Sequence, residues 1–564
     1  MSTEGSFDAI VIGSGITGGW AAKELTEKGL KVLMIERGRK VEHRTDYTTE
    51  TLGPWQLPFR GLGDPQVNAR DYPARVTGGF ANEWNQHFFA KDSENPFQTA
   101  PGHPFTWVRG YQLGGKSLIW GRLSFRWSDY DFDANRRDGH GVDWPIRYRD
   151  LAPWYDHVEE FVGISGSQER LPQLPDGKFQ PPMPLNHVEK AFKTKLEAQY
   201  PGRKLIIGRV ANMTVDKPEQ GRARCQYRNI CSRGCSYGAY FSTLSSTLPA
   251  AQKTGNLTVL TDRRVVAIDY DPVTKRATGV RVVNAQGKGG ETYKAKLIFV
   301  CAAALNSVQL LLQSRSESFP SGLGNTSGAL GRGVMDHVMG IIIAAVPGYT
   351  DRTYYGNRPN GFYIPRFRNI TEPKEGLLRG YAFQGSAGRP NWNRGSSMPV
   401  TGAALKNELR HQGGWVLALT PFNECLPRDD NQVVLDENHL DPMGLPQLKI
   451  DVSWGKNELA LLQDSMAEGA RMVESFGGQI VFKTEQPFNQ PGGAIHEMGG
   501  ARMGHDPKTS ILNKYNQMHD VPNVFVTDGA AMSSSACQNP SLTYMALTAR
   551  ACDSAVSMLK QHRI

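Results

Sequence analysis

The feature that most constrains this chain is a glycine-rich turn close to its first residue. Gly13, Gly15 and Gly18 form the pattern G-x-G-x-x-G between a short apolar run at residues 7–14 and a segment of helical character at 19–28. In a turn between strand and helix, the first glycine permits the tight bend and the second lets a pyrophosphate approach the backbone. The third glycine lets the helix pack closely on the strand. The pattern predicts the opening of a dinucleotide-binding unit.

A second apolar run supports this prediction. Residues 31–36 follow the helical segment and end in Glu36, eighteen residues after Gly18. A carboxylate at that place commonly holds an adenosine ribose hydroxyl, and the phosphates lie at the helix N-terminus, where free N–H groups favour negative charge. A glycine triplet alone could be a simple turn, but strand, helix and acidic residue are all in register. The pattern leaves FAD and NAD open.

The bulk composition excludes several classes of protein. The chain has 564 residues, of which 39% are hydrophobic and 21% charged, which is typical of a globular protein with two or more domains. The net charge of +9 is spread without a basic arm or patch, so we expect no nucleic-acid partner. No stretch reaches the roughly twenty apolar residues of a membrane-spanning helix. Residues 1–7 show no secretion signal, so the chain by itself is expected to be cytoplasmic.

Later segments extend the nucleotide-binding domain. Residues 296–302 indicate a buried strand that is followed by a helix at 306–313, and 523–527 indicate another strand. The domain is therefore expected to be assembled from separated pieces. Residues 55–104 and 347–483 are rich in Pro, Gly and Asn and show no clear period, so we assign them to an inserted domain that covers the substrate.

A second candidate site lies near the C-terminus. Asn539 is followed by Pro540, which predicts a helix N-cap with proline at the first helical position and a helix over 542–559. This helix follows a strand that ends at Asp528, so its positive end would face a cofactor at the carboxyl edge of the sheet. Asn539 could serve only as the cap, or it could contact a substrate.

Four stretches resemble the glucose-methanol-choline (GMC) oxidoreductase family. RGYQLGGKSLIWGR at 109–122 resembles its first flavin-contacting signature, and FVCAAALNSVQLLL at 299–312 resembles its second. In the second signature Ala303 stands where glycine is usual and Val308 where proline is usual. The runs at 144–156 and 322–337 also look like the family, and the likeness weakens in the inserted middle.

The resemblance implies an α/β fold in which a Rossmann-like FAD-binding domain of the GMC type carries an inserted α+β substrate-binding domain. We expect the FAD-binding domain to comprise residues 1–50, 105–150, 200–345 and 490–564. The substrate-binding domain and cap would comprise 51–104, 151–199 and 346–489. The expected cofactor-binding residues are Gly13, Gly15, Gly18, Glu36, Gly114, Gly115, Ser117, Val265, Asp528, Gly529 and Pro540. Some relatives attach flavin through a histidine where this chain has Ile119, so noncovalent FAD is expected.

The resemblance also assigns a catalytic pair. The family's H-x-x-G-x-x-R-M-G stretch and its NP asparagine correspond to His496 and Asn539. A neutral imidazole suits removal of a hydroxyl proton, and an amide can orient the alcohol but cannot accept that proton. His505, nine residues beyond His496, is expected to be structural. The inserted domain would add polar groups such as Gln384 or Asn423, but the sequence does not choose among them.

Three cysteines form a separate cluster with the spacing C-x5-C-x3-C: Cys225, Cys231 and Cys235. Zinc usually takes four protein ligands, a disulfide would leave one thiol over, and other soft metals remain possible. The spacing resembles that of bacterial flavin dehydrogenase subunits that hold a [3Fe-4S] cluster. No C-x-x-C-H haem motif is present, so a haem would belong to a partner.

The resemblance therefore implies an FAD-dependent dehydrogenase acting on a secondary hydroxyl of a sugar, glycoside or cyclitol, similar to the cluster-bearing enzymes of the glucoside 3-dehydrogenase type. The implied partners are a cytochrome c acceptor and a small subunit with an export signal, which would carry the chain to the periplasm. An oxygen-using sugar or alcohol oxidase of the same family is the alternative. A lyase that keeps flavin as a relic, or a non-enzymatic flavin or nucleic-acid binder, is less favoured.

Overall fold

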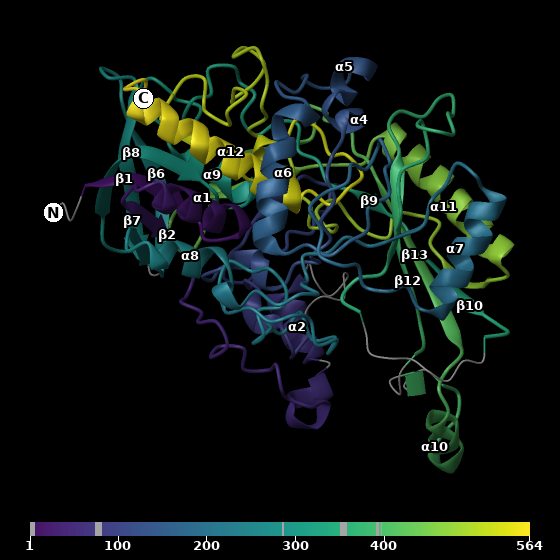
Figure 1. Cartoon of the computed structure of the whole chain (residues 1–564). Coiled ribbons are helices and arrows are strands. Elements are labelled where there is room, and N and C mark those ends of the chain that lie inside the picture. Colours follow the sequence, from purple (N-terminus) through teal and green to yellow (C-terminus); the bar gives the residue numbers. More distant parts are fainter. Residues whose placement is uncertain are drawn as a thin grey trace.

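The computed structural model describes residues 6–61, 63–73, 82–284, 287–349, 358–390, 394–395 and 398–564. Within these ranges the chain forms two seven-stranded sheets and a three-stranded sheet. Figure 1 shows the first large sheet beside helices α1 and α12, and the second, with β10, β12 and β13, at the opposite side of the molecule. The fold is thus an α/β nucleotide-binding layer joined to a second sheet, as predicted.

The first sheet has the strand order β5-β2-β1-β8-β7-β6, and β17 pairs with β8. Strands β1, β2, β5, β17 and the end of β8 pair in parallel, whereas β6, β7 and the start of β8 pair antiparallel. The bounds are β1 Phe7–Ile12, β2 Val32–Ile35, β5 Leu257–Leu260, β6 Arg263–Asp271, β7 Arg276–Asn284, β8 Glu291–Val300 and β17 Val524–Val526.

Both faces of the parallel strands are buried, which explains why they appear in the sequence as continuous apolar runs. In β1, Ala9 and Val11 belong to a core cluster that includes side chains of α1 (Ile16–Glu27), α8 (Thr247–Lys253) and α12 (Ser541–Lys560). Ile10 and Ile12 point to the opposite face and join a cluster with α9 (Ala304–Gln313). Alternation along the strand therefore fills two cores at once.

The parallel strands end together at one edge of the sheet. Their register pairs Ile12 with both Ile35 and Val300, and Val300 with Val526. The residues that follow these ends, among them Gly13, Glu36 and Asp528, are therefore brought to the same edge although Asp528 is hundreds of positions from the other two in sequence. This is the carboxyl edge, where nucleotides bind in such sheets.

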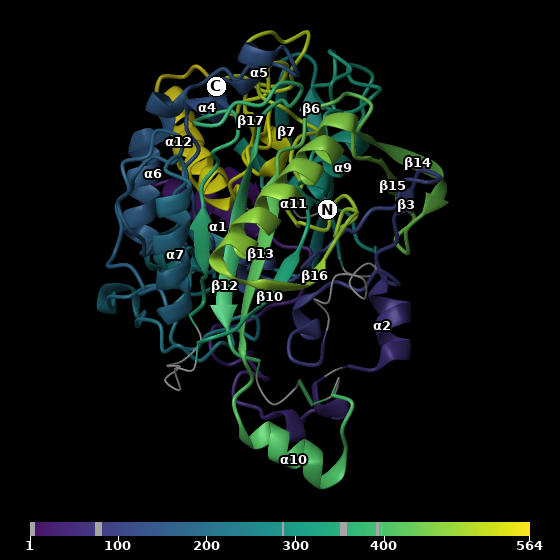
Figure 2. The same cartoon turned by 90° about the vertical axis from the view of Figure 1, so that its right-hand side faces the viewer.

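The second large sheet has the order β16-β10-β13-β12-β11-β4, with β9 paired to β13. Helices α7 (His187–Gln199) and α11 (Lys456–Phe476) contribute to the hydrophobic core on one of its faces, and α11 crosses in front of the sheet in Figure 2. The strands are β4 Ile206–Ile207, β9 Val338–Met339, β10 Ile342–Val346, β11 Phe362–Ile364, β12 Tyr381–Gly388, β13 Trp415–Asn423 and β16 Gln479–Lys483.

The sequence predicted no clear hydrophobic period for residues 347–483. This prediction is wrong for the part of that range that the structure describes. β13 alternates, because Trp415, Leu417 and Leu419 enter the core beside α11 while the residues between them face the other side. The sequence hides this alternation because Val416 and Ala418, which lie between the core residues, are apolar as well.

A small sheet and short helices complete the described chain. Strands β14 (Gln432–Leu440), β15 (Pro446–Asp451) and β3 (Gln98–Thr99) form the small sheet, which contacts α9 through β14. The remaining α-helices are α2 Pro65–Asp71, α4 Asp129–Phe132, α5 Ala134–Asp138, α6 Tyr148–Val162 and α10 Gly402–Arg410. The 3-10 helices are Pro54–Gln56, Pro58–Gly61, Gln86–Phe88, Gly115–Leu118, Pro218–Gln220 and Gly529–Ala531.

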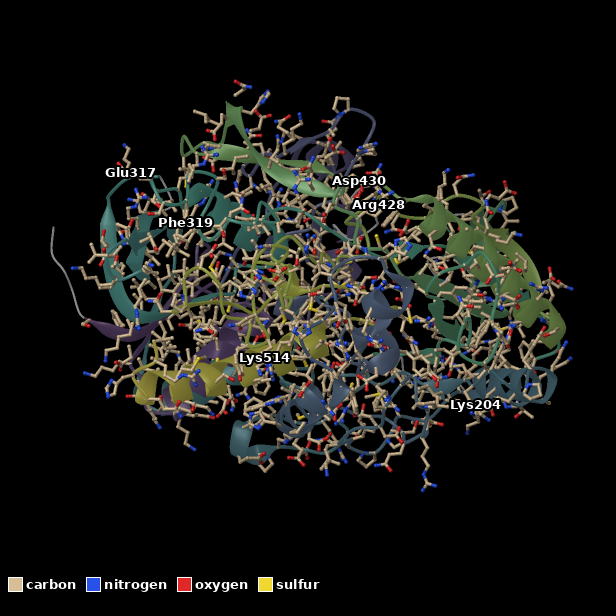
Figure 3. The ribbon with its side chains drawn as sticks, turned by 90° about the horizontal axis from the view of Figure 1, so that it is seen from above. Lys204, Glu317, Phe319, Arg428, Asp430 and Lys514 are labelled. Carbon is tan, nitrogen blue, oxygen red and sulfur yellow. The ribbon has the colours of Figure 1, made fainter. Side chains whose placement is uncertain are left out.

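The view from above (Figure 3) shows where residues from several parts of the chain lie. In Figure 3, Phe319 and Lys204 lie at opposite ends of the molecule, and Lys514 lies beside α12. Arg428 and Asp430, which form an ion pair of 3.4 Å, come from the segment that leads from β13 to β14. Among the described residues, no helix combines the length and apolarity that crossing a bilayer requires.

Candidate active site

A cavity of about 560 Å³ lies at the carboxyl edge of the first sheet. Its wall includes Gly13 and Glu36 from the nucleotide-binding unit, and His496 and Asn539 from the C-terminal segments. The second sheet adds Gln384 of β12 and Phe422 of β13, whose side chains face away from α11. The cavity therefore joins the predicted cofactor site and the predicted catalytic pair.

The three glycines of the first turn have three different environments. Gly13 has a φ of 95°, and a Cβ there would lie 2.6 Å from the carbonyl oxygen of Cys301. At Gly15, in the cavity wall, a Cβ would meet no atom within 4 Å. At Gly18 a Cβ would lie 1.9 Å from the carbonyl oxygen of Gly13. The tight turn, the open approach and the close helix packing required by a dinucleotide are thus all present.

Glu36 is buried at the end of β2 and faces the same cavity. Its carboxylate accepts hydrogen bonds from the backbone N–H and hydroxyl of Ser14 and from the backbone N–H of Gly38. Burial raises its pKa, and these donors oppose that shift. The carboxylate is therefore held in one orientation beside the glycine turn, where a ribose hydroxyl would bind.

Most of the other predicted cofactor residues also line the cavity. Those in its wall are Gly13, Gly15, Glu36, Gly115, Ser117, Val265, Asp528 and Gly529. Gly18, Gly114 and Pro540 lie behind it; the N–H of Gly114, for example, donates to the Ser14 hydroxyl at 2.9 Å. Ile119 is in the wall, and His496 is the only histidine among the described lining residues. The first signature contains no histidine to which a flavin could be covalently linked.

The two residues predicted to form the catalytic pair are in direct contact. Nδ2 of Asn539 lies 3.2 Å from Nε2 of His496. Oδ1 of Asn539 accepts a hydrogen bond of 2.8 Å from Nε2 of Gln384. On its other side, Nδ1 of His496 lies 2.9 Å from Nδ1 of His337. An amide donor and an imidazole nitrogen are thus presented together at the cavity wall.

The prediction that Asn539 caps the last helix is wrong. α12 begins at Ser541, its N-cap residue is Pro540, and the cap makes no side-chain hydrogen bond. The amide of Asn539 is instead bonded to Gln384 and His496, and its oxygen makes no capping bond to the helix. The side chain of Asn539 therefore does not cap α12.

Burial controls the ionisation of the groups around His496. Desolvation lowers the pKa of His496 well below its usual 6.5, and His337 and Lys116 add to this effect. Lys116 itself is paired with Glu497 at 3.1 Å. Burial, with a contribution from Glu497, raises the pKa of Asp336 to about 7, although that carboxyl accepts the backbone N–H of His496. His496 is accordingly neutral at physiological pH.

Of the two polar residues named for the inserted domain, only Gln384 faces the cavity. Asn423 is fully buried, and its amide donates to the carbonyl of Val338. His505 is mostly exposed, 3.9 Å from the Asp143 carboxylate, and lies outside the cavity wall. Sequence reasoning did not single out His337, although it is the last residue of the family-like run at 322–337.

The three clustered cysteines border the same small cavity. Cys225, Cys231 and Cys235 line one small cavity of about 20 Å³. Arg228 approaches the Cys235 sulfur at 3.8 Å. The neighbouring Ser232 lines the active-site cavity, so the cysteine loop reaches both places. Three thiols around one small cavity are a donor set of the kind that soft metals prefer. Among the described residues, however, the ligand atoms that lie within 4.8 Å of one another belong to Asp336, His337 and His496, so the three sulfurs are not drawn together to that distance.

The fold and site together define an oxidoreductase that holds a dinucleotide cofactor beside a histidine and an asparagine. Two family models, both described as GMC oxidoreductase, match residues 7–339 and 427–548. The chain belongs to the GMC oxidoreductase family, which implies FAD as the cofactor, and the glycine turn and Glu36 fit that cofactor.

Similar proteins are found along the whole chain. The fructose dehydrogenase large subunit of Gluconobacter japonicus is 26% identical, with 99% of each chain covered. Paromamine 6'-oxidase of Streptomyces fradiae is 28% identical over 96% of this chain and 89% of that protein. The crystal structure of pyridoxine 4-oxidase from Mesorbium loti has a TM-score of 0.62 at 16% identity, covering 98% of this chain and 99% of that chain, which shows a shared fold.

Proposed function

We propose that this protein is an FAD-dependent dehydrogenase that oxidises a secondary hydroxyl of a sugar, glycoside or cyclitol. The observation that carries the proposal is the contact of 3.2 Å between Asn539 and His496 in the wall of the cavity that Gly15 and Glu36 also line. When bound, FAD supplies a hydride acceptor at N5. The name of the fructose dehydrogenase relative favours a sugar substrate.

The two side chains have complementary tasks. A substrate hydroxyl that enters between them can accept a hydrogen bond from Nδ2 of Asn539 and donate its proton to Nε2 of His496. Because Gln384 holds Oδ1 of Asn539, the amide N–H group is kept facing His496. Asn539 therefore orients the alcohol, and His496 takes the proton as the carbon is oxidised.

We assign the pyrophosphate to Gly15 and the N-terminus of α1, and the adenosine ribose to Glu36. Gly115, Ser117, Val265, Asp528 and Gly529 line the remaining cavity, and binding would be noncovalent. We also keep the proposed division into a discontinuous FAD-binding domain (1–50, 105–150, 200–345 and 490–564) and a substrate-binding domain formed by the rest.

We further propose that Cys225, Cys231 and Cys235 hold a [3Fe-4S] cluster, which would supply one-electron transfer. A buried positive charge near the thiols supports this proposal, in addition to the thiols themselves. Arg222 is buried, its hydrogen bonds go only to the neutral oxygens of Gly238, Val162 and Gln220, and its Nη2 has no partner among the described residues. It interacts electrostatically with Cys235. A buried cation of this kind favours an anionic group at the thiols.

A cluster beside the active site implies an electron acceptor. We propose a cytochrome c partner, together with a small subunit whose export signal carries the folded complex to the periplasm. The words "large subunit" in the name of the Gluconobacter japonicus relative support a multi-subunit assembly. No nucleic-acid partner is proposed.

An oxygen-using oxidase is the alternative, and the name of the paromamine relative favours it. The deciding experiment is anaerobic mixing of the FAD-loaded protein with a panel of sugars, glycosides and cyclitols while the flavin spectrum is recorded. Bleaching with a sugar, followed by identification of the oxidised carbon, supports the proposal; no bleaching with any alcohol overturns it. Hydrogen peroxide formed in step with product in air would favour the oxidase.

A further inference from the structure

His337 lies directly behind the catalytic histidine and outside the cavity wall. It is fully buried, follows Asp336 and precedes β9, whereas His496 comes from a loop 159 residues further along the chain. The two imidazole rings are nearly perpendicular, at 89°, with centroids 5.0 Å apart. Nδ1 of His337 lies 2.9 Å from Nδ1 of His496, and Nε2 of His337 lies 2.9 Å from the backbone carbonyl oxygen of Ala536. The backbone of Ser535 also interacts with this ring.

The direction of these hydrogen bonds follows from the chemistry of the groups. A carbonyl oxygen only accepts, so Nε2 of His337 must carry the proton. Burial lowers the pKa of His337 to about 4, so the ring is neutral and its Nδ1 has a free lone pair. The proton between the two rings then belongs to Nδ1 of His496. Consequently Nε2 of His496 is unprotonated and accepts from Nδ2 of Asn539.

The backbone holds both ends of this chain of hydrogen bonds in unusual conformations. Ile495, immediately before His496, has a φ of 62°, and Ala536, which supplies the carbonyl, has a φ of 51°. A positive φ is costly for alanine and more so for a β-branched residue, so such conformations persist only where the surroundings enforce them. Asn489 adds a further restraint by donating to the carbonyl of His337.

We propose that His337 is a positioning residue that fixes the tautomer of His496, so that Nε2 of His496 is the nitrogen left free to accept the substrate proton. The inference rests on the proposed function of His496 as the base. When the alcohol proton moves to Nε2, the positive charge of His496 is shared with the lone pair of His337 through their existing hydrogen bond. Loss of a charge-assisted bond of this kind should slow the reaction roughly ten- to a hundredfold.

Two variants of His337 separate its two hydrogen bonds. His337→Asn places an amide oxygen near the original Nδ1 and keeps the acceptor for His496, whereas His337→Gln places an amide nitrogen near Nε2 and keeps only the donor to Ala536. With the sugar that bleaches the wild-type flavin, we expect the Gln variant to lose roughly ten- to a hundredfold in the rate of flavin reduction, and the Asn variant to recover most of it. KM should change little. Equal losses in both variants would overturn the proposal.

A second measurement needs no substrate. In ¹⁵N-histidine-labelled, FAD-loaded protein, two-bond ¹H–¹⁵N spectra distinguish protonated from unprotonated ring nitrogens, and His496→Gln identifies the signals of His496. We expect Nδ1 protonated and Nε2 free in the wild type, and a mixture of tautomers in His337→Leu. His519→Leu, which removes a half-buried histidine outside the cavity, is the control and should leave the His496 signals unchanged. A proton on Nε2 in the wild type would disprove the inference. If no sugar bleaches the flavin, the proposed function fails while these spectra still decide the tautomer.

Discussion

Nε2 of Gln384 donates a hydrogen bond of 2.8 Å to Oδ1 of Asn539, and this bond joins the second sheet to the loop that precedes α12. Along β12, Tyr381 and Phe383 enter the core beside α11, so the intervening positions face the catalytic loops. Strand alternation alone therefore aims Gln384 at the cavity. The second sheet therefore holds the amide of Asn539, for which the proposed function has a catalytic role, in one orientation.

Gln384→Glu should slow flavin reduction by about tenfold without loss of FAD. A carboxylate cannot donate, so it would draw the N–H group of Asn539 toward itself and turn the amide oxygen toward His496. Rapid-mixing kinetics with the bleaching sugar measure the effect. Gln447→Glu is the matched control, because Gln447 is a buried strand glutamine outside the cavity whose amide also donates a hydrogen bond. An undiminished rate in Gln384→Glu would contradict this role.

His496→Ala should leave FAD bound and slow flavin reduction by roughly a hundredfold or more, the effect of losing a positioned base. Asn539→Ala should also slow reduction. The Asn539→Ala variant should lose less thermal stability than removal of a helix cap would cost, because the Asn539 side chain does not cap α12. Flavin absorbance, rapid mixing and thermal unfolding report the three quantities. Unchanged kinetics in His496→Ala would remove this histidine from the mechanism.

The pH dependence of stability should differ between the wild type and His337→Asn. Burial lowers the folded-state pKa of His337 from 6.5 to about 4, so the unfolded chain binds a proton that the folded chain does not. The wild type should therefore lose about 3 kcal/mol relative to the variant as the pH falls from 6.5 to 4. Asp336, Lys116 and Glu497 surround the histidine pair in both proteins, so their contributions largely cancel in the difference. The pKa of His496 is lowered first by its burial, which the variant keeps. Denaturant unfolding at a series of pH values measures it; a constant difference would contradict the shift.

Ala303→Gly should stabilise the folded protein by about 1 kcal/mol. Ala303 has a φ of 73° and a ψ of 145°, a region that strongly favours glycine, and relief of this strain should exceed the added entropy of the unfolded chain. Ala302→Gly is the control: Ala302 does not have a positive φ, so its replacement should destabilise. Thermal unfolding of the FAD-loaded variants compares the two. A loss of stability in Ala303→Gly equal to that in Ala302→Gly would disprove the strain.

The sequence indicated the nucleotide-binding half because its signals are local. Gly13 to Glu36 lie within one strand, turn, helix, strand unit, and each glycine has a steric reason to be there. The sequence also showed that Ala303 stands where the family usually has glycine, and in the structure this residue has a positive φ. The environment of His496 was not predictable in the same way. His337 and Gln384 approach the pair from segments more than 100 residues away, and neither carries a local pattern that states where its side chain points.

Cys231→Ser should remove iron and sulfide from the protein while leaving FAD in place. A hydroxyl is a poor ligand where soft thiolates are needed, and Cys225 and Cys235 alone would hold a cluster weakly. Flavin reduction by sugar should continue, because His496 and Asn539 are untouched, but reduction of a cytochrome c acceptor should collapse. The measurements are metal and sulfide analysis of anaerobically purified protein, rapid mixing and cytochrome assays. Cys552→Ser is the matched control, since Cys552 of α12 is buried, lines neither the cysteine cavity nor the active-site cavity, and should leave the iron content unchanged. Zinc or no metal in the wild type, or full cytochrome reduction in Cys231→Ser, would overturn the cluster and favour the oxidase.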